Sequence, residues 1–176
     1  MTTVTAPLKP ATPAVMPSIY RIATGDRDKL RGLRLRALKD SPDCFLSVHA
    51  IEREYPAGRW TTEFERGDWY AGMNRGADVS LIGVTREPGM PESERYIEYM
   101  WVARRVRRNG VGEFMLREIL EILRGSGVKV VYLWVLDGNV AAAELYRKVG
   151  FTFTDVVQPL AARPGRSEHQ MVLHLA

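Results

Sequence analysis

The chain has 176 residues and a formal net charge of +4 at pH 7, with apolar and charged fractions of 45% and 26%. This composition is ordinary for one globular domain, favours anionic ligands in general, and contains no apolar run long enough to cross a bilayer. Because the start of the chain has no secretory-signal pattern and Cys44 is the single cysteine, we expect a cytoplasmic protein without an intrachain disulfide.

Residues 1–17 contain four prolines among Thr, Ala and Val, which predicts a flexible tail before a single domain over residues 18–176. Residues 18–23 read as a first strand. Thr24-Gly25-Asp26 then supplies helix N-cap chemistry, and Ser41-Pro42-Asp43 ends the helix that follows. A second helical region over 50–66 is interrupted by Pro56.

Residues 68–74 and 79–85 predict two strands joined as a hairpin, and a Pro- and Gly-containing loop follows over 86–94. The aromatic and β-branched segment 96–102 predicts the next strand. On that strand Glu98 alternates with Ile97 and Tyr99, so we expect its side chain to lie on the opposite face from both neighbours.

A basic, glycine-bearing turn over residues 104–112 leads from this strand into an amphipathic helix, whose predicted buried face carries Val111, Met115, Ile119 and Ile122. Free backbone N–H groups at the positive end of a helix dipole bind phosphate well. Gly110 and Gly112 allow close backbone approach, and the four arginines at 104, 105, 107 and 108 add positive charge. The turn is therefore a candidate anion site, although a solvated loop that caps the helix would have the same pattern.

Gly125-Ser126-Gly127 ends the helix, and the nearly unbroken apolar run 128–136 predicts a strand buried on both faces. Asn139 is a good N-cap for a short helix that ends at Gly150, and 151–157 and 168–175 predict the last two strands. The expected order is β-α-α-β-β-β-α-β-α-β-β, which is an α/β fold with a mixed sheet.

Three motifs in this order resemble the GNAT superfamily of acyl-CoA-dependent N-acetyltransferases. They are Met100-Trp101-Val102, the turn Arg107-x-x-Gly110-x-Gly112, and the segment from Asn139 to Gly150-Phe151 with Ala142 and Tyr146 at the family spacing. The motifs cover residues 96–151, whereas the N-terminal half resembles the family mainly in its order of elements. The resemblance implies the GNAT fold, with central parallel strands that splay apart.

The same resemblance implies acetyl-CoA as the acyl donor and a primary amine as the acceptor, with no metal. Pantetheine would pair with backbone around Val102 and Arg104, and a backbone N–H near Met100 or Trp101 would bond the thioester oxygen. The pyrophosphate would lie on the amides from Arg108 to Glu113. The predicted cofactor-binding set is Met100, Trp101, Val102, Arg104, Arg107, Arg108, Asn109, Gly110, Val111, Gly112, Glu113, Asn139 and Tyr146.

Two predicted catalytic residues follow from the resemblance and from the chemistry of the reaction. Tyr146, with an ordinary pKa of about 10, would protonate the leaving thiolate. Glu98 is a candidate general base if it faces the cleft; a solvated or paired carboxylate, or a chain of waters, is the alternative. Glu63, Glu65 and Asp68 are further candidates without motif support.

Other readings have weaker support. His49, His169 and His174 lack metal-ligand spacing, and no CxxC pair accompanies Cys44. The arginine turn could contact nucleic acid, but no nucleic-acid motif accompanies it. A GNAT-fold module that binds acyl-CoA without turnover stays open, as do a homodimer, the length of the acyl group and the identity of the acceptor.

Overall fold

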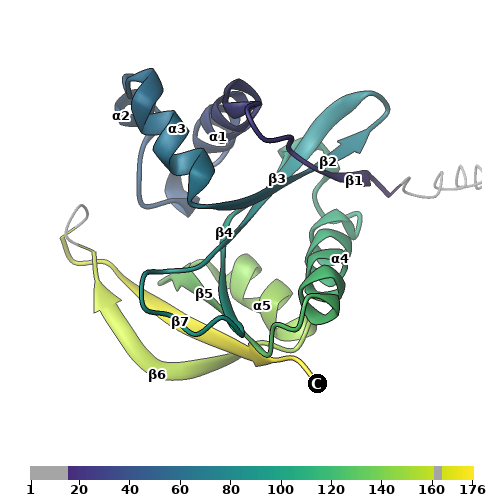
Figure 1. The fold of residues 1–176 in the computed structure, drawn as a ribbon. Helices are drawn as coiled ribbons and strands as arrows, with labels where there is room; N and C mark the ends of the chain where they lie inside the picture. Colours follow the sequence, from purple (N-terminus) through teal and green to yellow (C-terminus); the bar gives the residue numbers. More distant parts are fainter. Residues whose placement is uncertain (1–15, 161–163) are drawn as a thin grey trace, which may run out of the picture.

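The computed structural model describes residues 16–160 and 164–176 and contains one mixed seven-stranded sheet (Figure 1). The predicted tail therefore lies outside the described residues apart from Met16 and Pro17. β4 and β5 pair in parallel, and the other neighbouring strands of the described sheet are antiparallel, so the predicted α/β fold with a mixed sheet is confirmed. The order along the sheet is β1-β2-β3-β4-β5-β7-β6, with β1 (Ser18–Arg21), β2 (Gly67–Asn74), β3 (Ala77–Thr85), β4 (Glu94–Val102), β5 (Val130–Leu136), β6 (Thr152–Pro159) and β7 (Ser167–His174).

The helices begin and end where capping residues and prolines predict. The Asp26 carboxylate accepts a hydrogen bond from the Lys29 N–H at 3.2 Å, and the Asn139 side chain accepts one from the Ala142 N–H at 3.3 Å. Pro56 separates two helices that the sequence grouped in one interrupted region. The helices are α1 (Arg27–Asp40), α2 (His49–Glu52), α3 (Ala57–Glu65), α4 (Val111–Gly125) and α5 (Val140–Lys148), with 3₁₀ turns at Pro42–Cys44 and Arg104–Val106.

The sheet has a hydrophobic core on each face. α4 and α5 pack on one face through a core that includes Met115 and Leu133, and α1 packs on the other face through a core that includes Trp69 and Trp101. Ile122, predicted to be buried, is 45% exposed. The prediction was wrong because the buried stripe of α4 includes Leu116, Leu120 and Leu123. These residues flank Ile119 on the side of the helix opposite to Ile122.

The parallel strands β4 and β5 separate before either strand ends. Their paired residues run only from Glu94 with Val130 to Ile97 with Leu133, although β4 continues to Val102 and β5 to Leu136. The backbone groups along this gap are thus free of the β4–β5 ladder. A splay of this kind is what the resemblance implied for the central strands.

A β-bulge bends β4 at the start of the gap. Two residues of β4, Tyr99 and Met100, oppose the single residue Ile82 of β3, and Tyr99 has a positive φ of 54°. The bulge breaks the expected alternation, because Ile97 belongs to the α4 core while Tyr99 packs against the α1 core. Glu98 therefore shares a face with Tyr99, and the expectation that they point to opposite faces was wrong.

β5 is buried on one face only. Val131, Leu133 and Val135 are buried against α4 and α5, whereas Tyr132 and Trp134, on the opposite face, are only half-buried. The prediction of burial on both faces was therefore wrong. α1 covers that opposite face only over β2, β3 and β4. On β5, β7 and β6, the face turned away from α4 and α5 has no described helix packed on it in either core cluster.

Candidate functional site

The glycine turn ends in an α4 N-terminus that has no side-chain cap. Gly110 is the N-cap residue and adopts a left-handed conformation with φ 80°, and no side chain of residues 16–160 or 164–176 bonds the first amides of the helix. The N–H groups of Val111, Gly112 and Glu113 therefore lack intrahelical acceptors. They form the local geometry that binds phosphate at the positive end of a long helix.

Gly112 lies where β4, α4 and α5 meet. A Cβ on this residue would be 3.1 Å from Leu145 Cδ2 and 3.6 Å from both Met100 Cε and Val102 Cγ2. The position therefore has no room for a bulky side chain. This places the α4 amides next to the end of β4, beside the gap between β4 and β5.

Arg107 does not extend from the turn as the sequence suggested. Its Nε donates to the Val102 carbonyl at 2.8 Å, and its guanidinium reaches the Asp40 carboxylate at 2.9 Å. Asp40 also accepts hydrogen bonds from Trp101 Nε1 at 3.0 Å and from the Arg104 N–H at 3.3 Å. The Arg107 side chain thus holds the turn against the end of α1, and it bonds a carbonyl that was predicted to face pantetheine.

Two other arginines of the turn keep their side chains available. Arg104 and Arg108 are exposed, and neither side chain forms an ion pair with a described residue. Arg108 has a positive φ of 61°, two residues before the left-handed Gly110. Glu113, by contrast, points away from the turn and pairs with Lys148 and Arg117, whose hydrogen bonds lower the pKa of its carboxyl.

Tyr146 is buried on α5, and its ring lies 6.1 Å from that of Phe151. Burial, together with the nearby Cys44 thiol, raises the pKa of its hydroxyl above the ordinary value of about 10. The group therefore stays protonated at neutral pH, as a general acid must. Cys44 lies in the turn after α1, so that turn approaches Tyr146, a proximity that sequence reasoning missed.

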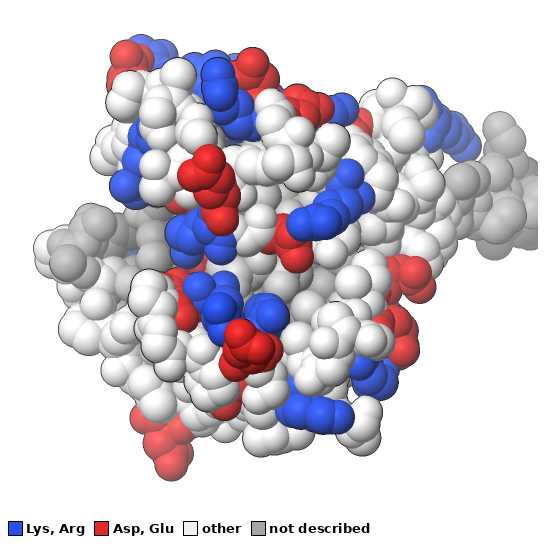
Figure 2. All heavy atoms as spheres, viewed as in Figure 1, with Lys and Arg blue, Asp and Glu red and all other residues white. Residues whose placement is uncertain are grey.

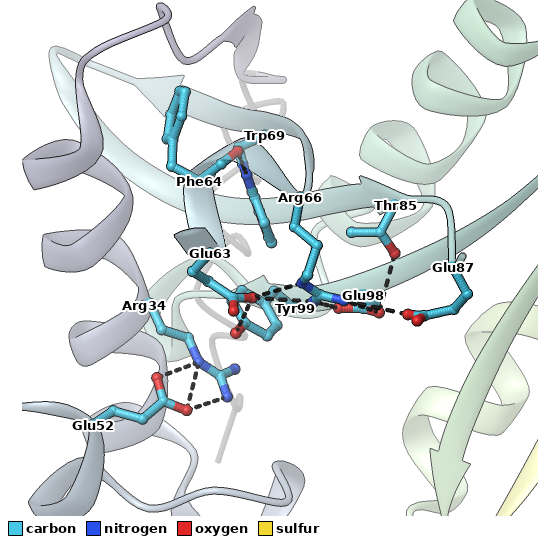
Figure 3. A network of polar contacts seen from close by, with 10 residues as sticks. All are labelled: Arg34, Glu52, Glu63, Phe64, Arg66, Trp69, Thr85, Glu87, Glu98 and Tyr99. Atoms are coloured by element: carbon cyan, nitrogen blue, oxygen red, sulfur yellow. Dashed lines mark hydrogen bonds and ion pairs between the residues drawn. The ribbon is translucent and has the colours of Figure 1, made fainter. Parts of the chain in front are cut away.

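Glu98 lies in a network of polar contacts rather than free in a cleft (Figure 3). Arg66 donates to both of its carboxylate oxygens, and the Thr85 hydroxyl donates to one of them at 3.1 Å. Arg66 also bonds Glu63, which accepts a further hydrogen bond of 2.7 Å from the Tyr99 hydroxyl. Because both oxygens of Glu98 are engaged, this arrangement disfavours it as the proton acceptor.

The remaining base candidates are also paired or lie elsewhere. Asp68 forms an exposed ion pair with Arg21, and both residues line a cavity of about 760 Å³ together with Glu65. Ser126 and Gly127, just after α4, line the same cavity, which therefore lies at the opposite end of α4 from the glycine turn. Acidic and basic side chains lie side by side around the hollowed centre of the face in Figure 2.

A buried ion pair, which the sequence did not predict, supports the Tyr99 bulge. Arg34 of α1 bonds Glu52 of α2 through Nε at 2.9 Å and a terminal nitrogen at 2.7 Å, and both side chains are 4% exposed. The guanidinium carbon lies 3.8 Å from the ring centroid of Tyr99 and 4.7 Å from that of Phe45. The pair therefore fixes α1, α2 and the bulge relative to one another (Figure 3).

The described residues hold no group of three or more His, Cys, Asp or Glu side chains placed to bind a metal. Over the same part of the chain, no helix has the length and apolar character needed to cross a membrane.

Comparisons with known proteins agree with the fold. A model of the acetyltransferase (GNAT) family matches residues 34–151. N-alpha-acetyltransferase RimI of Mycobacterium tuberculosis is 37% identical over 83 residues, which are 47% of this chain and 51% of that protein. GCN5-related N-acetyltransferase 6 of Arabidopsis thaliana, a chloroplastic protein, is 43% identical over 60 residues, which are 34% of this chain and 21% of that protein.

The matches thus span about half and about a fifth of these two curated relatives. Among solved structures, an acetyltransferase of the GNAT family from Streptococcus pneumoniae superposes with a TM-score of 0.73 at 18% identity, covering 90% of this chain and 99% of that one. At this identity the likeness concerns the fold alone.

Proposed function

Because this chain belongs to the GNAT acetyltransferase family, we propose that it moves an acetyl group from acetyl-CoA to a primary amine of a small molecule, peptide or protein. The observation that carries the proposal is the gap between β4 and β5, with the uncapped N-terminus of α4 beside it. The gap offers unpaired backbone to an extended ligand, and the helix end offers amides to its phosphates.

Binding of the cofactor would use backbone groups first. The amides of Val111, Gly112 and Glu113 would hold the pyrophosphate, with the exposed Arg104 and Arg108 side chains as charge partners. The pantetheine arm would lie along the end of β4 from Met100 to Arg104. Asn139 already caps α5, and that role accounts for its position without a contact to the cofactor.

The amine nitrogen would attack the thioester carbonyl and form a tetrahedral oxyanion. A backbone N–H near Met100 or Trp101 would stabilise this charge, and one such donor typically contributes about 2.7–4 kcal/mol to lowering the barrier. On collapse the C–S bond breaks, and Tyr146 gives its proton to the sulfur. Burial disfavours the charged form of both groups, so the thiolate becomes more basic in the same surroundings that raise the pKa of Tyr146.

Turnover with defined amines tests the proposal. Acetyl-CoA would be mixed with the protein and, in turn, with spermidine, tyramine, an alanine-initiated peptide and an N-blocked lysine peptide. We expect thiol release that depends on at least one amine, together with a product heavier by one acetyl group in mass spectrometry. Binding of acetyl-CoA without release on any of these amines would instead indicate a non-catalytic acyl-CoA-binding module.

A further inference from the structure

The uncovered face of β5 and β7 carries a row of aromatic and polar side chains. Tyr132 pairs with Tyr96, and Trp134 with Gln170, and residues that pair across strands lie on the same face. The rings of Tyr96 and Tyr132 are 5.5 Å apart, and Gln170 donates a hydrogen bond of 3.0 Å to the Tyr96 hydroxyl. This ordered surface starts where β4 and β5 are still paired and continues along β5 and β7 beside the gap.

Glu168 ends this row and is 5% exposed. It pairs with Leu136, the last residue of β5, beyond the point where β4 and β5 separate. One of its oxygens accepts a hydrogen bond from the Gln158 amide, and no cation among the described residues pairs with it. Buried carboxylates are usually paired with a cation or bonded by several donors, as Glu52 is by Arg34.

The burial of Glu168 favours its protonated form. Burial raises the pKa of its carboxyl; the Gln158 hydrogen bond acts in the opposite direction, and the negative charge of Glu98 adds to the increase. Glu98 lies on the same face, one residue past the last β4–β5 pair, and it is balanced by Arg66. A buried carboxyl with a raised pKa, one of whose oxygens has no partner among the described residues, is suited to accept a proton.

We propose that Glu168 is the general base of the acetyl transfer, with the oxygen that has no described partner taking a proton from the acceptor ammonium directly or through one water. This role rests on the proposed function. The N–H bond of the ammonium breaks as an O–H bond forms on Glu168, and the neutral nitrogen then forms the N–C bond. When the C–S bond breaks, Tyr146 protonates the sulfur, and the second proton lost by the nitrogen restores Tyr146. Glu168 returns its proton to solvent.

The test compares pH profiles of kcat/KM for the wild type, Glu168→Gln and Glu98→Gln, using the amine from the panel that the wild type acetylates fastest. In the wild type kcat/KM should rise with pH as Glu168 loses its proton, above the ordinary glutamate value of about 4.3. Glu168→Gln should lower kcat/KM at pH 7 by about 10²–10⁴-fold and remove that rise. Glu98→Gln should keep the rise but move it to lower pH, because a neighbouring negative charge is gone.

Two further readouts separate the outcomes. Glu168→Gln should keep the acetyl-CoA-induced increase in melting temperature, which shows that its fold and cofactor site are intact. If that variant does not fold, ¹³C-carboxyl NMR titration of the wild type tests the proposal by measuring the pKa of Glu168. An ordinary pKa for Glu168 would overturn the proposal. Wild-type turnover with an unchanged Glu168→Gln profile would overturn the base role alone, whereas a wild type that acetylates no amine would remove the proposed function as well.

Discussion

Replacing Tyr146 by Phe is expected to lower kcat by about 10²–10⁴-fold, the range that general acid catalysis contributes. Only the hydroxyl is removed, and it makes no hydrogen bond with another described residue, so the fold should not change. Acetyl-CoA should therefore bind the variant as it binds the wild type. Steady-state kinetics on the amine panel, together with calorimetric titration of acetyl-CoA, would measure both quantities.

Tyr70→Phe is the matched control, because it removes another buried tyrosine hydroxyl whose pKa is also raised by burial. Tyr70 lies on β2, away from the gap, and its variant should retain wild-type kcat.

The raised pKa of Tyr146 means that its hydroxyl loses its proton only above pH 10. We therefore expect any fall in kcat caused by loss of this proton to occur only above pH 10. Wild-type kcat in Tyr146→Phe would show that the thiolate receives its proton from another source.

Glu52→Gln is expected to cost about 3–5 kcal/mol of unfolding free energy, because it leaves the Arg34 charge buried without its partner. For a chain of this size the melting temperature should fall by on the order of 10 °C. Denaturant unfolding followed by circular dichroism would measure the loss. One terminal nitrogen of Arg34 already has no hydrogen-bond partner among the described residues. The loss of Glu52 would therefore leave the guanidinium without a carboxylate.

Glu54→Gln is the control for this stability effect. Glu54 follows Glu52 by two residues and pairs with Arg53, and the side chains of Arg53 and Glu54 are 58% and 70% exposed. Exposed ion pairs contribute only about 0–1 kcal/mol to the free energy of unfolding. The double variant Arg34→Met/Glu52→Leu should regain much of the lost stability, since it removes both buried charges. Equal stability of Glu52→Gln and the wild type would show that the buried Arg34 charge does not need the Glu52 carboxylate.

Local signals in the sequence were enough to predict the helix starts and the glycine turn before α4. Asp26 and Asn139 predict their helix starts because a side-chain oxygen satisfies a free amide, and this chemistry needs no tertiary contact. Gly110 and Gly112 likewise predict a turn that approaches a ligand closely. Both features depend on neighbours within a few residues, which periodicity and composition record.

The features that the sequence did not predict depend on contacts between distant segments. The bulge at Tyr99 follows from how β4 meets β3, and it moves Tyr99 to the same face as Glu98. Arg107 turns inward because Asp40, 67 residues earlier, lies within its reach. Glu168 stands out only when the folded sheet shows which of its faces is left uncovered. A pattern of residue types along the chain contains none of this information.

Thermal unfolding with acetyl-CoA tests the central claim, that the gap beside α4 binds this cofactor. A ligand at about a hundred times its dissociation constant adds roughly 2.7 kcal/mol, on the order of 5–10 °C in melting temperature here. We expect this increase with acetyl-CoA, little with ATP or random DNA, and none in Gly112→Trp, whose side chain would meet Leu145. No increase with acetyl-CoA, but one with DNA, would contradict the account and leave the arginine turn as a nucleic-acid contact.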